Sequence, residues 1–114
     1  MQSRPRILSG KTVMVVTGMG KMYITINEVD GKPFEVFATI GKSGKSIQAK
    51  AEAIGRLVSL NLRSGVSVKD VIRQTEGIAG DKPHNDGALL ILSIPDAIAK
   101  VLKELYVSQG KDGD

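Results

Sequence analysis

A change of hydrophobic period within Phe34–Leu60 constrains the fold of this chain more than any other feature. Residues 34–40 alternate apolar and polar side chains, which predicts a strand with one buried face. Beyond that strand the apolar residues recur every three or four positions, as in an amphipathic helix. The apolar positions of this helix are Ile47, Ala51, Ile54 and Val58, with Leu57 beside them. The chain therefore passes from strand to helix across 41–46.

The six residues of that turn are Gly41, Lys42, Ser43, Gly44, Lys45 and Ser46. Glycine adopts backbone angles closed to other residues, and Ser43 or Ser46 can cap the helix that follows. Helix-start amides attract anions, and two lysines add positive charge. The turn is therefore the candidate ligand site, for an anion or nucleotide, and a plain strand-to-helix turn is the alternative. The phosphate-loop motif also needs a glycine five residues earlier, and neither frame has one, so nucleotide hydrolysis is not expected.

The segments before this turn predict an antiparallel meander. Alternating residues predict strands over 12–17 and 21–28, separated by the turn Gly18-Met19-Gly20. The dipeptide Asp30-Gly31 is a hairpin signal and leads into the strand over 34–40.

The segments after the turn predict two more helices and one more strand. The capping boxes Ser67/Asp70 and Ser93/Asp96 each begin a helix, and Gly65 is the expected left-handed cap of the helix before them. On the last helix, Lys100 is expected to face outward. Residues 77–87 have the composition of a surface loop, whereas the apolar run 88–92 predicts a buried strand added to the meander.

These elements predict an α+β fold in one domain over residues 10–107. The expected antiparallel sheet has about four strands, over 12–17, 21–28, 34–40 and 88–92. Helices near 46–64, 67–75 and 94–107 are expected to cover one of its faces. Residues 1–9 are expected to form a flexible arm with solvated arginines at Arg4 and Arg6, and 108–114 a disordered tail.

Composition excludes several classes of function. The chain has 114 residues and no cysteine, so it can form no disulfide and use no catalytic thiol. It contains no apolar run of the ~20 residues that a membrane span requires, and we expect a cytoplasmic protein without membrane association. The net charge of +4 comes from lysines and arginines that are scattered singly, without the regular interleaving of aromatic residues that base stacking requires. A solvated surface is the favoured interpretation, and nucleic-acid binding is the alternative.

No catalytic or metal-binding constellation stands out. The single histidine, His84, lies between Asp81 and Asp86, and this spacing in a loop is a weak metal pattern. No serine or cysteine stands at a recognisable spacing from His84 for nucleophilic catalysis. We therefore expect no metal site and no enzyme activity from this chain by itself.

Several segments of the chain form a recognisable pattern because they occur together and in a particular order. They are Leu8–Thr12, Thr17–Asn27, Gly31–Phe37, Ile40–Gly44, Glu52–Leu57, Leu62–Gly65 and Ser93–Ala99. In this combination, over roughly residues 7 to 107, the chain resembles the TSCPD domain. That domain is found near the C-terminus of adenosylcobalamin-dependent (class II) ribonucleotide reductases and in small stand-alone proteins.

The resemblance implies an accessory or interaction domain of deoxyribonucleotide synthesis. In those enzymes the cobalamin lies in a catalytic barrel that a chain of this length cannot contain. The resemblance therefore implies no cofactor bound by this domain, with adenosylcobalamin only by association. A ribonucleotide reductase catalytic chain is the implied partner. An exposed apolar residue or an exposed sheet edge is the expected contact of a homo-oligomer, whose order the sequence leaves open. A small protein that binds an anion, a nucleotide or nucleic acid through Gly41–Ser46 is the alternative.

The chain departs from the family signature at two positions. The family has cysteine where Ile94 stands, and another cysteine commonly follows Gly77-Ile78, near Gly80. Both are absent here, which puts in doubt any redox or zinc role that they support. The apolar Ile94 predicts that this position has become part of the core.

Overall fold

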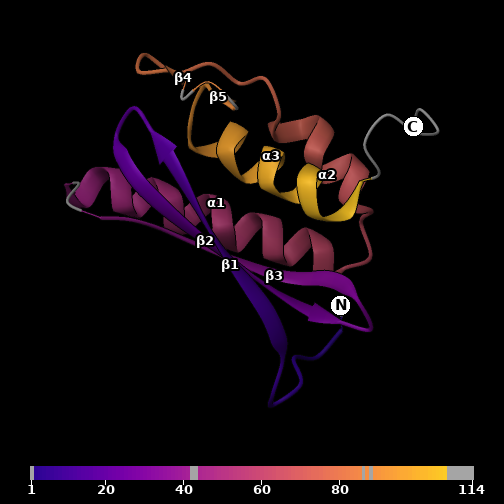
Figure 1. Cartoon of the computed structure of the whole chain (residues 1–114). Coiled ribbons are helices and arrows are strands. Elements are labelled where there is room, and N and C mark those ends of the chain that lie inside the picture. Colours follow the sequence, from indigo (N-terminus) through magenta and orange to yellow (C-terminus); the bar gives the residue numbers. More distant parts are fainter. Residues whose placement is uncertain (1, 42–43, 86, 88, 108–114) are drawn as a thin grey trace.

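An antiparallel meander and a layer of three helices make up this α+β fold, as the sequence predicts (Figure 1). The computed structural model describes residues 2–41, 44–85, 87 and 89–107. The elements are β1 (Ser9–Thr17), β2 (Gly20–Val29), β3 (Lys32–Ile40), α1 (Lys45–Arg63), α2 (Val68–Thr75), β4 (His84–Asn85), β5 (Leu90–Ile91) and α3 (Ile94–Tyr106). Within these residues, no helix combines the length and the apolar character needed to cross a bilayer.

Tight turns set the register of the meander, whose strand order is β1-β2-β3. Asp30 and Gly31 have φ values of 52° and 76°, the positive angles that this kind of hairpin turn requires, so the predicted hairpin is confirmed. Thr17 pairs with Gly20 at the other hairpin. One face of β2 is then completely buried, through Met22, Ile24 and Ile26.

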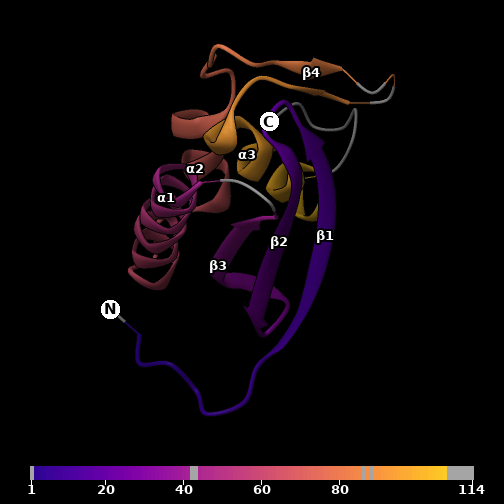
Figure 2. The ribbon, with the colours of Figure 1, turned by 90° about the vertical axis from the view of Figure 1, so that its left-hand side faces the viewer.

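The core lies between this face of the sheet and the helices. It joins residues of β2 and β3 to Ala51 and Val58 of α1, Val71 and Ile72 of α2, and a continuous stripe of α3. Figure 2 shows α1 beside β3, at the opposite end of the sheet from β1. The apolar stripe of α1 is narrower than its sequence predicts, because the side chain of Leu57 is 60% exposed.

Side chains of α1 close the outer edge of β3. The hydroxyl of Ser59 accepts a hydrogen bond from Val36 N at 2.8 Å and donates one to Val36 O at 3.1 Å. Gln48 donates to the carbonyl of Ile40 in the same way. A Cβ on Gly55 would lie 3.0 Å from Val36 O, which is tighter than an ordinary van der Waals contact, so glycine favours this close approach of the helix.

The prediction that residues 88–92 extend the meander is wrong. Leu90–Ile91 pairs instead with His84–Asn85 in a separate two-stranded sheet, so residues 77–87 are also not loop throughout. Because α1 already occupies the edge beside β3, no further strand can add there, and no described segment pairs with the other edge, β1. Ile91 is buried in the core, whereas Leu90 is 46% exposed.

Hydrogen bonds to the side chain of Asp96 connect the loop before α3 to the start of that helix. The capping box is confirmed, since Ser93 Oγ accepts from Asp96 N. The carboxylate of Asp96 is completely buried and accepts from Gly77 N at 2.8 Å and Leu92 N at 2.9 Å. Lys100 lies 2.9 Å from it and is therefore not the outward-facing residue that the sequence predicts. Burial raises the pKa of the Asp96 carboxyl, but the two amides and Lys100 outweigh it and lower the pKa.

We expect Asp96→Asn to lower the free energy of unfolding by about 2 to 4 kcal/mol, because a buried amide and Lys100 lose their acceptor. The matched control is Asp70→Asn, the same position of the other capping box but exposed, with an expected cost of about 0.5 kcal/mol. Urea unfolding of both variants measures the difference. Because folding lowers the pKa of Asp96, its stabilisation is complete above the pKa of the unfolded chain and is lost as pH falls through the folded pKa. Equal costs for the two variants would contradict this role of Asp96.

Candidate functional site

The predicted glycine-lysine turn connects β3 to α1 at the surface. Gly41 N donates to Lys21 O at 3.1 Å, and Gly44 is the N-cap of α1, without a side-chain hydrogen bond to the helix start. Ser46 lies inside the helix and is not the cap, while Lys42 and Ser43 lie outside the described residues. Four hollows of the described surface are all lined by other residues. The anion site at this turn therefore stays a prediction.

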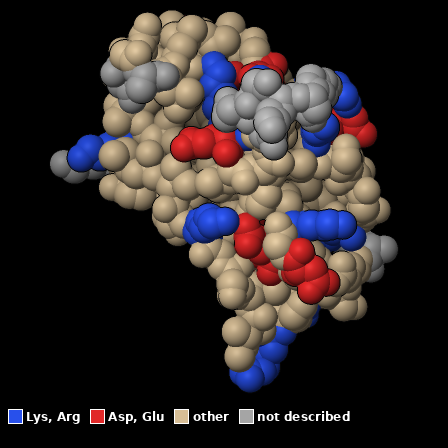
Figure 3. All heavy atoms as spheres, turned by 45° about the vertical axis from the view of Figure 1, so that its right-hand side comes forward, with Lys and Arg blue, Asp and Glu red and all other residues tan. Residues whose placement is uncertain are grey.

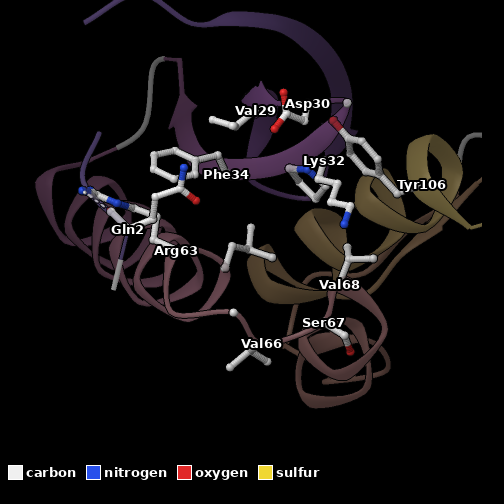
Figure 4. A pocket seen from close by; sticks show the side chains of 14 residues that line it. Gln2, Val29, Asp30, Lys32, Phe34, Arg63, Val66, Ser67, Val68 and Tyr106 are labelled. Carbon is white, nitrogen blue, oxygen red and sulfur yellow. Dashed lines mark hydrogen bonds between the residues drawn. The ribbon is translucent and has the colours of Figure 1, made fainter. Parts of the chain in front are cut away.

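A hollow of about 710 Å³ lies at the other end of α1 (Figure 4). The turn between β2 and β3, the end of α1, the start of α2 and Tyr106 enclose it. A bulge shapes one wall: Glu28 pairs with Pro33 and Asn27 with Glu35, so Phe34 is the extra residue of β3.

Arg63 is the most unusual residue of this hollow. Its guanidinium lies over the ring of Phe34, 5.1 Å from the ring centroid. Its Nε is buried and lacks a hydrogen-bond partner, alone among the buried side-chain nitrogen and oxygen atoms of the described residues. Lys32 also lines the hollow, and Figure 4 shows its amine on the side away from Arg63. Because a buried N–H without an acceptor is costly, this arrangement suits a ligand that brings one, such as a carboxylate or phosphate.

Sequence analysis missed this hollow. Arg63 was identified only as part of the end of a helix, and Phe34 only as the start of a strand. The bulge that places Phe34 under Arg63 leaves no recognisable signal in the pattern of residues 34–40. The hollow arises from tertiary packing between segments that are distant in the chain.

The N-terminal arm is anchored by one of its arginines. Arg4 donates to both carboxylate oxygens of Glu35, each at 3.0 Å, and Asn27 donates to the same carboxylate at 2.7 Å. The prediction that Arg4 is merely solvated is therefore wrong. Glu35 is only 3% exposed; burial raises the pKa of its carboxyl, but the hydrogen bonds from Arg4 and Asn27 outweigh burial and lower the pKa.

Tyr106 and Glu28 form a second polar contact beside the hollow. The Tyr106 hydroxyl donates to the carboxylate of Glu28, which also pairs with Lys11 at 3.1 Å. Burial and this hydrogen bond raise the pKa of Tyr106. The hydrogen bonds from Tyr106 and Lys11 lower the pKa of the Glu28 carboxyl. The tyrosine is therefore protonated at neutral pH and acts as a donor that fixes the end of α3.

Charges of both signs are interleaved on the face shown in Figure 3. Lysines and arginines lie next to aspartates and glutamates on this face. Ion pairs also join side chains of opposite charge, as between Lys103 and Glu76 at 3.1 Å. This face therefore lacks the continuous basic surface that follows a phosphate backbone.

The two positions where the resemblance expects cysteine lie together. Gly80 N donates to Leu92 O at 2.9 Å, and Gly80 and Ile94 line one hollow of about 330 Å³ with Met19 and Ile54. Ile94 is buried, which confirms its predicted place in the core. Among the described residues, no three His, Asp or Glu side chains are grouped to hold a metal ion; Asp86 lies outside them.

Comparison with known proteins gives one match. No curated protein and no solved structure matches the chain. The family model described as the TSCPD domain matches residues 1–106, which include every helix and strand described above. The chain therefore belongs to the TSCPD domain family.

Proposed function

We propose that this TSCPD domain is a non-catalytic binding module of deoxyribonucleotide synthesis. Its proposed partner is the catalytic chain of an adenosylcobalamin-dependent ribonucleotide reductase, and adenosylcobalamin belongs to that partner. Membership of the family supports the proposal, since TSCPD domains are found in ribonucleotide-reductase-related proteins.

The observation that carries the proposal is that the buried acids of the domain are committed to structure. Asp96 holds two backbone amides and Lys100, and Glu35 holds Arg4 and Asn27. A general acid or base needs a pKa near the working pH, whereas both of these carboxyls have lowered pKa values. The chain also has no thiol. Binding is the function that the remaining surface supports.

The outer face of the sheet is the surface best suited to a protein partner. No helix covers it, and Met14, Tyr23 and Phe37 are 47%, 43% and 53% exposed there. The register places Tyr23 directly beside Met14 and Thr39, so these side chains form one patch. Aromatic residues and methionine are enriched at protein interfaces, and such a patch provides buried anchors for a partner.

We expect the purified reductase catalytic chain of the same organism to bind this domain saturably in biolayer interferometry. Phe37→Ser should weaken binding about tenfold, because it removes an aromatic anchor. Leu57→Ser is the matched control, since Leu57 is similarly exposed but lies on α1, and the affinity of this variant should be unchanged. If the wild-type domain does not bind the catalytic chain, the proposed partner is wrong. If Phe37→Ser and Leu57→Ser lose affinity equally, the outer face of the sheet is not the docking surface.

A second candidate function is the binding of a small anion in the hollow of Figure 4. The buried Nε of Arg63 without a partner favours it, together with Lys32 across the hollow. The ring of Phe34 lies under the guanidinium of Arg63, where it holds that group in place and excludes water from one face of it. This site differs from the predicted turn at Gly41–Ser46, which lies at the opposite end of α1.

Titration with inorganic phosphate and with ADP, followed by NMR, distinguishes the two anion sites. We expect the Nε–H signal of Arg63 to shift at millimolar ligand, and Arg63→Gln to abolish the shifts. Arg56→Gln is the matched control, because Arg56 is on the same helix but exposed and paired with Glu52. Shifts confined to the amides of residues 44–46 would indicate that the anion binds at the predicted turn and not in the hollow. If no signal shifts with either ligand, both candidate anion sites are contradicted.

A further inference from the structure

The two edge strands of the meander differ in whether their outward backbone groups have hydrogen-bond partners. On β3, Ser59 and Gln48 of α1 bond the outward backbone groups of Val36 and Ile40, as described above. On the opposite side β1 ends the sheet, and no described segment pairs with it. The structure therefore leaves a nine-residue strand with one unpaired edge.

The register shows which groups this edge presents. Thr17 and Gly20 close a two-residue hairpin, so the odd-numbered residues of β1 bond to β2. The backbone N–H and C=O groups of the even-numbered residues point outward. These residues are Gly10, Thr12, Met14 and Val16. Each of them offers one donor and one acceptor to another strand.

β1 lacks the usual devices that keep a sheet edge from pairing. It contains no proline, and its register with β2 runs without a bulge. Its only charged residue is Lys11, whose amine is held by Glu28 on the neighbouring strand at 3.1 Å. Natural proteins seldom leave a long, regular edge unprotected unless a partner strand covers it.

We propose that two copies of this chain pair through β1 in antiparallel orientation. The two-fold axis passes beside Val13, so Val13 lies opposite the partner's Val13 and Thr12 opposite the partner's Met14. The two meanders then form one continuous sheet of six strands. The half-buried side chain of Val13 becomes covered on the inner face.

Three features identify a second copy as the occupant. This register pairs all nine residues of β1, which no shifted self-pairing does. It brings no like charges together, because Lys11 lies opposite the partner's Val15. Finally, α1 closes the β3 edge in each copy, so both outer edges of the six-stranded sheet are covered within the described residues, and the assembly ends at two subunits, the commonest closed symmetry.

Sedimentation equilibrium and light scattering test the dimer. We expect the wild-type chain to have twice its 12.1 kDa mass, dissociating on dilution. Met14→Pro should be a folded monomer by circular dichroism, because it removes an outward N–H and leaves the ladder with β2 intact. Met14→Thr keeps the backbone donor and should remain dimeric. A wild-type monomer at millimolar concentration, or a Met14→Pro dimer, overturns the proposal.

Cysteine cross-linking tests the register, whatever the folding of the proline variant, since the chain has no other cysteine. Val13→Cys should form an intermolecular disulfide on oxidation, because facing residues of a non-hydrogen-bonded pair lie about 4.5 Å apart at Cα. Lys11→Cys is the matched control on the same face, with its two copies about 14 Å apart in this register. Cross-linking of Lys11→Cys in preference to Val13→Cys overturns the proposed pairing.

Discussion

The contact between α1 and the outer edge of β3 is the constraint on which the rest of this structure depends. An edge strand buried beside a helix needs partners for its backbone groups, and Ser59 and Gln48 supply them at two points. Gly55 brings the helix close enough for both. Because α1 is fixed in this way, the packing of Arg63 beside Phe34 at its C-terminal end is fixed too.

Local chemistry in the sequence predicted most of the fold. The Asp30-Gly31 turn, the caps at Ser67 and Ser93, and the left-handed Gly65 all occur where the sequence places them. These signals involve residues within four positions of one another, so they do not depend on distant packing. For this reason the three predicted helices agree with the structure to within about one residue at each end.

The errors and omissions share a different physical origin. Periodicity shows that a segment has an apolar face, but not which element covers that face. Leu57 fits the stripe of α1 and yet is exposed, and residues 88–92 were expected to extend the meander, whereas Leu90–Ile91 pairs with His84–Asn85. The contact of Arg4 with Glu35 joins residues 31 positions apart, and no local pattern signals it. The candidate hollow at Arg63 was missed for the same reason.

The positions near Gly80 and Ile94 show how this chain differs from what its family resemblance implies. Both positions line one small hollow, so side chains placed there lie close together in this fold. Here Gly80 and Ile94 stand at these positions, and burial of Ile94 at the start of α3 stabilises the core. Packing therefore stabilises this corner of the fold, and the sequence has no thiol to place there.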